Sequence, residues 1–227
     1  MGDSSETLTL PAGRKVEASV ALSAMLRKTP SASVGLLGGT FDPVHAGHLA
    51  LAHTALAQLS LEALLFVPAA CAPLRTTPPV ASLADRWHLL ELALAETADP
   101  RLGLCNVEAR DEKVHYTIDT VHELRAEWPS ARFVWLLGAD QFAQLDRWRS
   151  PQELAQLVEF AVLERPGAPP AQPPPGIATT LRWRRLNGTP HPANSTEIRR
   201  LRKAGEPWAF WLPRSVAAAI EERNLYR

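Results

Sequence analysis

Residues 38–48 read GGTFDPVHAGH, and this stretch decides the fold. It follows an apolar run at residues 34–37 that is typical of a short buried strand, and it precedes residues 49–59, which have the composition of a helix. A strand, a glycine turn and a helix start are well suited to hold a phosphate chain, because glycine lets the backbone approach closely and the first helical amides point at the anion. We expect His45 and His48 to lie on one face of the first helical turn.

The composition is that of an ordinary globular chain. It has 227 residues, of which 46% are hydrophobic and 21% charged, and one domain is the default at this length. A formal net charge of zero argues against bulk binding of nucleic acid or of an acidic membrane surface, and no apolar run approaches the roughly 20 residues of a membrane span. Cys71 and Cys105 have no metal-ligand spacing, which favours reduced thiols and a cytoplasmic protein. The oligomeric state stays open, and a homo-oligomer is compatible with the sequence.

The first 32 residues differ from the rest. They lack the basic start and continuous apolar core of a secretory signal, and we expect a flexible N-terminal extension before a single domain at residues 33–227. A short amphipathic helix at residues 16–28 is the alternative. Met25 is a candidate for the true start, because the first core strand begins only at Val34.

Strand-like and helix-like segments alternate from residue 34 onward. The pattern predicts strands at residues 34–37, 63–67, 101–107, 132–137, 160–163 and 181–186. It predicts helices at residues 49–59, 83–97, 117–128, 151–157, 196–204 and 213–223. The proline-rich residues 167–180 are expected to form a surface loop. The alternation is typical of an α/β fold: a Rossmann-like, doubly wound parallel sheet, here with a small C-terminal helical portion.

Apolar side chains mark the inner faces of two predicted helices. On the helix at residues 83–97 the stripe is Leu83, Trp87, Leu90 and Leu94. On the helix at residues 117–128 it is Ile118, Val121, Leu124 and Trp128. Ligands of doubly wound sheets bind at the carboxyl ends of strands, so residues 38–40 and 138–140 should line the same edge.

The HxGH pattern formed by His45 and His48 resembles the nucleotidyltransferases that share it, and within them GGTFDPVHAGH is similar to the nicotinate-nucleotide adenylyltransferase family. Further stretches resemble the same family in the same order. They are Tyr116-Thr117, GADQ at residues 138–141, RPG at 165–167, NSTEIR at 194–199 and IEERNLYR at 220–227.

The resemblance implies adenylyl transfer from ATP to nicotinate mononucleotide, with His45, His48 and Arg199 as catalytic residues and His48 as the main stabiliser of the transition state. The ATP-binding residues that it implies are Gly38, Gly39, Thr40, Phe41, Gly138, Asp140, Ser195 and Thr196. Those implied for nicotinate mononucleotide are Tyr116, Thr117, Ile118, Trp148 and Arg75. Mg²⁺ is expected to be held mainly by ATP phosphates and water, without a protein metal site.

Elementary chemistry agrees with this residue set. The attacking phosphate monoester is already anionic at neutral pH, so the reaction needs no general base. The site must instead bring two anions together and stabilise the charge that moves onto pyrophosphate, which suits imidazoles and a guanidinium.

Some positions and rival functions stay open. Asp42 is expected to cap the first helix rather than contact a ligand. Asn194 or Ser195 is expected to cap the helix before Arg199, with Glu197 completing a capping box, and Arg202 is expected at the surface. The loop at residues 68–75 keeps a basic residue but lacks the polar residues usual in the family. The rival functions are another HxGH enzyme similar to pantetheine-phosphate adenylyltransferase, and a non-catalytic regulator that senses ATP or NAD.

Overall fold

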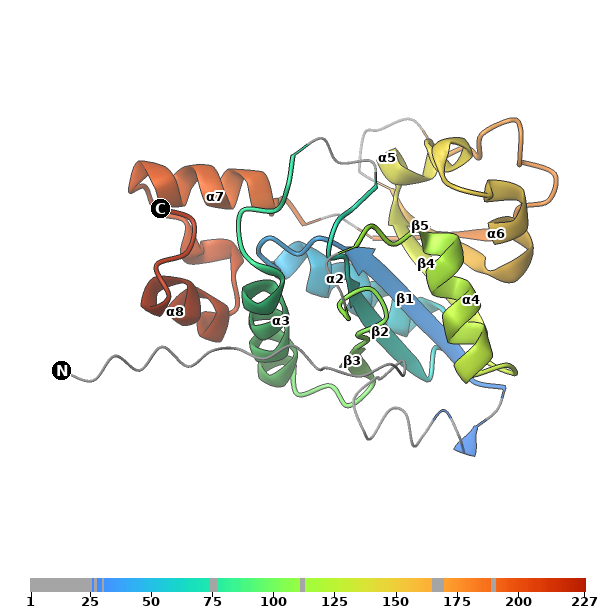
Figure 1. Cartoon of the computed structure of the whole chain (residues 1–227), viewed down its shortest axis with the longest axis horizontal. Helices are drawn as coiled ribbons and strands as arrows, with labels where there is room; N and C mark the ends of the chain where they lie inside the picture. Colours follow the sequence, from blue (N-terminus) through green and yellow to red (C-terminus); the bar gives the residue numbers. More distant parts are fainter. Residues whose placement is uncertain are drawn as a thin grey trace.

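The computed structural model describes residues 26, 28–29, 31–73, 77–110, 113–164, 170–188 and 191–227. Six parallel strands form one sheet in the order β3-β2-β1-β4-β5-β6 (Figure 1). The strands are β1 Ser33–Gly39, β2 Ala63–Pro68, β3 Leu102–Leu104, β4 Arg132–Gly138, β5 Glu159–Leu163 and β6 Trp183–Leu186. The strand order reverses between β1 and β4, so their carboxyl ends open the crevice where ligands of such sheets bind.

Helices cover both faces of the sheet. The α-helices are α2 Ala46–Gln58, α3 Leu83–Thr97, α4 Thr117–Glu127, α5 Ala139–Phe142, α6 Pro151–Leu157, α7 Ser195–Ala204 and α8 Arg214–Glu222. One core joins the sheet to α4 and α6, and the other joins it to α2, α3 and α8. Figure 1 shows α4 and α2 on opposite sides of the strands. The doubly wound architecture predicted from the alternation is therefore confirmed.

Strand β2 shows why both faces are needed. Its sequence ALLFVP is buried at every position, as expected for a strand inside a parallel sheet. Leu65 and Val67 face the core under α4, while Leu64 and Phe66 face the core under α2 and α3. The two-residue period of the strand thus supplies both cores.

Two sequence-based details were wrong. The third strand spans only Leu102–Leu104, because the chain leaves the sheet after the Cys105 amide donates to the Phe66 carbonyl and then turns at residues 107–109. On α3 the buried side chains are Leu83, Arg86, Leu89, Leu90 and Ala93, whereas Trp87 and Leu94 are only partly buried. The buried face of α3 is therefore rotated about the helix axis relative to the predicted apolar stripe, and it includes a buried arginine. The stripe predicted for α4 is confirmed, with Trp128 at its C-cap.

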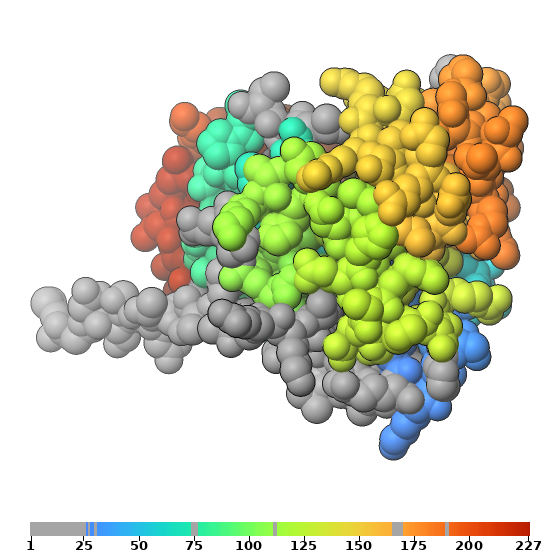
Figure 2. Space-filling model, turned by 45° about the vertical axis from the view of Figure 1, so that its right-hand side comes forward, coloured from blue at the N-terminus to red at the C-terminus, as the bar shows by residue number. Residues whose placement is uncertain are grey.

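The proline-rich segment, where described, forms turns on the outside of the molecule (Figure 2). Its Ala171 and Ile177 are nevertheless buried in the core beneath α4. Leu26 is also buried in that core, while most of the predicted N-terminal extension lies outside the described residues. None of the helices in the described part of the chain has the length and apolar character that a membrane crossing requires.

Candidate active site

Two histidines close the start of α2. His45 is the N-cap, and its Nδ1 accepts a hydrogen bond from the Gly47 amide at 3.1 Å. His48 Nδ1 accepts from the His45 amide at 3.2 Å, and the two rings stack with centroids 3.8 Å apart. Because Nδ1 is an acceptor in both neutral rings, the hydrogen bonds assign the proton to Nε2 in each. Both imidazoles can therefore donate through Nε2 to an anion.

The two imidazoles are neutral at pH 7 in the free protein. Burial, followed by the nearby His191, lowers the pKa of His45 to about 4. Burial and then His45 hold the pKa of His48 well below its usual value. Repulsion between neighbouring cations and loss of hydration both disfavour the charged ring. A bound triphosphate would act in the opposite direction.

Asp42 fixes the loop between β1 and α2 to the segment before α3. Its side chain is 1% exposed, and its carboxylate accepts hydrogen bonds from the amides of Val80 at 2.8 Å and Ala81 at 3.1 Å. The prediction that Asp42 caps α2 was wrong, because the ring of His45 takes the capping position and the carboxylate points toward the segment before α3.

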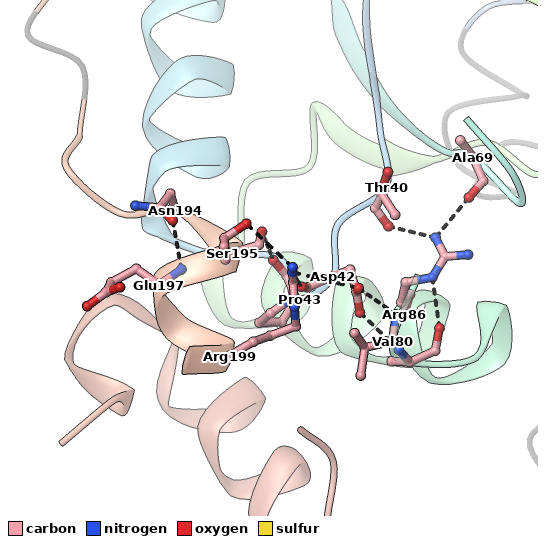
Figure 3. A network of polar contacts seen from close by, with 12 residues as sticks. Thr40, Asp42, Pro43, Ala69, Val80, Arg86, Asn194, Ser195, Glu197 and Arg199 are labelled. Carbon is pink, nitrogen blue, oxygen red and sulfur yellow. Dashed lines mark hydrogen bonds and ion pairs between the residues drawn. The ribbon is translucent and has the colours of Figure 1, made fainter. Parts of the chain in front are cut away.

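Helix α7 brings Arg199 to the same loop (Figure 3). Arg199 Nη1 donates to the Asp42 carbonyl at 2.6 Å and lies 3.7 Å from the Asp42 carboxylate. The Ser195 hydroxyl donates to the Pro43 carbonyl at 3.0 Å. The structure therefore gathers the two histidines and the arginine, which come from segments about 150 residues apart, around one turn of backbone.

The start of α7 follows the sequence analysis in part. Asn194 is the N-cap, and its side chain accepts from the Glu197 amide at 2.8 Å. The Glu197 carboxylate pairs with Arg200 at 2.9 Å. Arg202 was wrongly expected at the surface: its side chain is only 9% exposed, lies over the Trp208 ring and pairs with Glu221. Thr196 is exposed, and its hydroxyl lies 3.4 Å from Arg199 Nη2.

The residues predicted for the acceptor nucleotide also lie together. Tyr116 is the N-cap residue of α4, and its side chain makes no cap hydrogen bond. The side chain therefore does not occupy the first amides of α4, which lie next to it. The Arg149 guanidinium lies 4.7 Å from the Tyr116 ring centroid and 3.5 Å from Asp119, which brings Trp148 toward the start of α4. Trp148 is half-buried and meets the edge of Trp135.

The structure describes most of the remaining predicted site residues, and they differ in burial. The side chain of Ile118 is buried in the core, which leaves only its amide for a ligand. Thr117 is half-buried at the first position of α4. Asp140 is exposed in the first turn of α5, directly after Gly138 at the end of β4. Gly38, Gly39, Thr40 and Phe41 form the end of β1 and its loop, and the Phe41 ring meets the edge of His48 at 4.9 Å. Arg75 and residues 165–167 lie outside the described residues.

Three residues near this loop were missed from sequence. Arg86 is 1% exposed and donates to the Thr40 carbonyl at 2.6 Å. Tyr226 is buried near Asp42, where burial and then that carboxylate raise the pKa of its hydroxyl. His191 Nδ1 accepts from the Ala193 amide at 3.1 Å. A signal existed for Arg86, because it is spaced three and four residues from Leu83 and Leu90, but no local pattern marks the other two.

A hollow of about 550 Å³ at the opposite end of the sheet is a weaker candidate for a ligand site. The carboxyl ends of α2, α4 and α6 meet there, and the negative ends of helix dipoles disfavour anions. Arg125 and Arg182 in this hollow donate to the last-turn carbonyls of Leu157 and Gln156. These arginines therefore satisfy helix ends.

No set of three or more histidine, cysteine, aspartate or glutamate side chains is arranged to hold a metal ion within the described ranges. The carboxylate of Asp42, in the same loop as His45, already accepts hydrogen bonds from two amides.

Comparisons with known proteins identify the family of this chain. The Cytidylyltransferase-like family matches residues 36–201. A protein of Opitutus terrae named "Probable nicotinate-nucleotide adenylyltransferase" is 39% identical over 196 residues, which cover 86% of this chain and 97% of the relative. A protein of Bordetella petrii with the same name is 42% identical over 199 residues, covering 86% and 98%. The chain belongs to the nicotinate-nucleotide adenylyltransferase family. The family resemblance inferred from the sequence motifs is thus confirmed.

Solved structures support the fold. Nicotinic acid mononucleotide adenylyltransferase of Plasmodium falciparum, complexed with NaAD, aligns with a TM-score of 0.69 at 17% identity. The same enzyme complexed with APC aligns with a TM-score of 0.68 at 16% identity. Each alignment covers 86% of this chain and 97% of the other.

Proposed function

We propose that this protein transfers the adenylyl group of Mg·ATP to nicotinate mononucleotide, giving nicotinate adenine dinucleotide and pyrophosphate in NAD biosynthesis. The observation that carries the proposal is the convergence of His45, His48 and Arg199 on the loop after β1, at the switch point of the sheet. Membership of the nicotinate-nucleotide adenylyltransferase family supports the choice of substrates.

The reaction needs these side chains to bind and stabilise rather than to move protons. An oxygen of the acceptor phosphate forms a bond to the α-phosphorus of ATP, and the bond from that phosphorus to the bridging oxygen of the β-phosphate breaks. The Nε2 groups of His45 and His48 donate to phosphate oxygens, and His48 stabilises the charge that develops toward pyrophosphate. Arg199 donates its remaining N–H groups to the β- and γ-phosphates, and Ser195 and Thr196 offer amides at the start of α7. Mg²⁺ enters with ATP as part of the substrate.

The other predicted residues have complementary roles in this proposal. The backbone of Gly38–Thr40 approaches the phosphates beside the Phe41 ring, and Asp140 at the end of β4 accepts from the ribose hydroxyls of ATP. The first amides of α4, at Thr117 and Ile118, hold the ring carboxylate of the acceptor. Trp148 stacks on its pyridinium ring, with Tyr116 alongside and Arg75 on the phosphate. The unpaired thiols of Cys71 and Cys105 suit a reducing, cytoplasmic location.

The test is pyrophosphate release by purified protein with Mg·ATP and one acceptor at a time. We expect release with nicotinate mononucleotide, and weaker release with nicotinamide mononucleotide, which lacks the carboxylate. Release with phosphopantetheine alone would reassign the acceptor. No release with any acceptor, despite ATP binding, would indicate a regulator that senses nucleotide without turnover.

A further inference from the structure

Arg86 is a buried cation next to the candidate site that the proposed chemistry does not use. It lies on the inner face of α3 and is 1% exposed. A buried guanidinium is costly unless acceptors surround it, so such a residue persists where its hydrogen bonds hold something in place.

The acceptors of Arg86 come from loops at two neighbouring strand ends (Figure 3). Nη1 donates to the Thr40 carbonyl at 2.6 Å and to the Ala69 carbonyl at 2.8 Å, while Nη2 reaches the Ala70 carbonyl at 3.3 Å. Thr40 is the first residue after β1, and Ala69 and Ala70 directly follow β2. One planar guanidinium therefore bridges the carboxyl ends of two adjacent strands, which the single ammonium of a lysine cannot do with the same geometry.

A second set of bonds closes the same unit. The Ala69 amide donates to the Gly39 carbonyl at 2.9 Å. At the far end of the loop after β2, Ala81 is bonded from both sides: its amide donates to Asp42, and its carbonyl accepts from Arg86 Nε at 3.4 Å. The phosphate-side loop and both ends of the next loop are thus tied through Asp42 and Arg86.

The loop after β2 continues this connection toward the acceptor side. Cys71 forms an isolated parallel β-bridge with Val114, two residues before Tyr116. Tyr116 and Thr117 begin α4, where the proposed function places the carboxylate of nicotinate. An unbroken series of contacts therefore runs from Thr40 through Arg86 and the loop after β2 to the start of α4.

We propose that Arg86 is a positioning residue that couples the two substrate subsites, so that ATP bound at the loop after β1 orders residues 69–73 after β2 and the start of α4. The identity of the second substrate rests on the proposed function, whereas the coupling between the loops does not. Binding of the two substrates is then mutually favourable, and each tightens the binding of the other by the same factor.

The first experiment measures amide hydrogen exchange by mass spectrometry with a non-hydrolysable ATP analogue alone. In the unaltered protein the analogue should slow exchange in peptides that cover residues 69–73 and 113–118. The Arg86→Met and Arg86→Lys variants should still bind the analogue but lose that distant protection. Absence of protection at residues 69–73 in the unaltered protein would overturn the proposal, whatever the variants do.

The second experiment measures the dissociation constant of nicotinate mononucleotide with and without the analogue. We expect the analogue to tighten binding about fivefold or more in the unaltered protein, and to leave it nearly unchanged in Arg86→Met. Leu90→Ala is the matched control, because Leu90 is fully buried on the same helix face. It should lower the melting temperature and keep the fivefold ratio.

The outcomes separate this proposal from the proposed function. Coupling that survives in Arg86→Met would show that Arg86 does not couple the subsites. Coupling that fails equally in Leu90→Ala would show that Arg86 acts only through stability. Failure of the unaltered protein to release pyrophosphate from ATP and nicotinate mononucleotide would reject the function, while the exchange experiment with the ATP analogue would still decide the coupling.

Discussion

Asp42→Asn tests whether a buried carboxylate holds the loop that carries the paired histidines. An asparagine keeps the shape and one carbonyl oxygen, so one of the two amides at Val80 and Ala81 loses its acceptor and faces an NH₂ group. A hydrogen bond to a charged group contributes about 1.5–3 kcal/mol, and an amide left unsatisfied adds a desolvation cost.

The charge of Asp42 is also lost beside Arg199. The nearest nitrogen and oxygen of the pair lie 3.7 Å apart, with the carboxylate side chain 1% and the arginine side chain 20% exposed. Removing one partner of a fully buried pair costs about 3–5 kcal/mol. Solvent screening at Arg199 lowers that value, so we expect Asp42→Asn to reduce the free energy of unfolding by about 3 kcal/mol in total.

The assay is urea unfolding of the ligand-free protein at pH 7, followed by circular dichroism. Glu206→Gln is the control, because Glu206 pairs with Arg200 at 3.0 Å where both side chains are about half exposed. An exposed pair of this kind should cost about 1 kcal/mol or less. A loss below about 1 kcal/mol for Asp42→Asn would refute the reasoning, since it would mean that the carboxylate carries no more than a surface charge.

Four further outcomes follow from the geometry. His48→Ala should lower the rate of pyrophosphate release about a hundredfold, and near-normal release would remove His48 from the mechanism. Binding of Mg·ATP at pH 6 should take up protons, because the triphosphate raises the low pKa of His45. Calorimetry in buffers of different ionisation enthalpy measures this uptake. An absence of uptake would mean that the rings stay neutral and would contradict the prediction. Burial raises the pKa of Glu108 to about 7, so the folded protein binds its proton more tightly and loses up to about 3 kcal/mol of stability as pH rises from about 4.5 to 7. Glu108→Gln, which keeps an acceptor for the Thr120 hydroxyl, should abolish that fall in unfolding experiments at pH 5 and 8. Gly205→Ala should cost about 1 kcal/mol in thermal unfolding, because Gly205 has a φ of +70°, which an alanine backbone adopts at a cost. The added Cβ has nothing within 4 Å, so no clash contributes. An unchanged melting temperature would contradict this prediction.

Local sequence patterns predicted the parts of the fold that depend on local chemistry. The helices predicted at residues 83–97 and 151–157 match α3 and α6. In the structure Ser82 caps the first helix, and Pro151 lies in the first turn of the second. The alternation of strands and helices predicted the doubly wound parallel sheet, whereas the order of its strands is seen only in the structure.

Long-range polar contacts could not be predicted in the same way. The role of Asp42 depends on amides 38 and 39 residues away, and Tyr226 reaches it from the other end of the chain. Arg86 was overlooked because charged side chains are usually solvated, and only the loops above α3 make its burial favourable. In the described residues, the sequence therefore predicted the secondary structure better than the polar contacts beneath the loops.

The paired imidazoles at the start of α2 have a practical consequence for work in cells. Each ring accepts an amide hydrogen through Nδ1, so removal of either ring also removes part of the helix cap. A strain that carries an alanine at one of these positions, intended only as a dead-enzyme control, would also contain less of the protein, because loss of a cap costs about 1 kcal/mol and the cell degrades partly unfolded chains. Glutamine at residue 48 would be the better comparison, with abundance checked by immunoblot before any phenotype is attributed to lost catalysis.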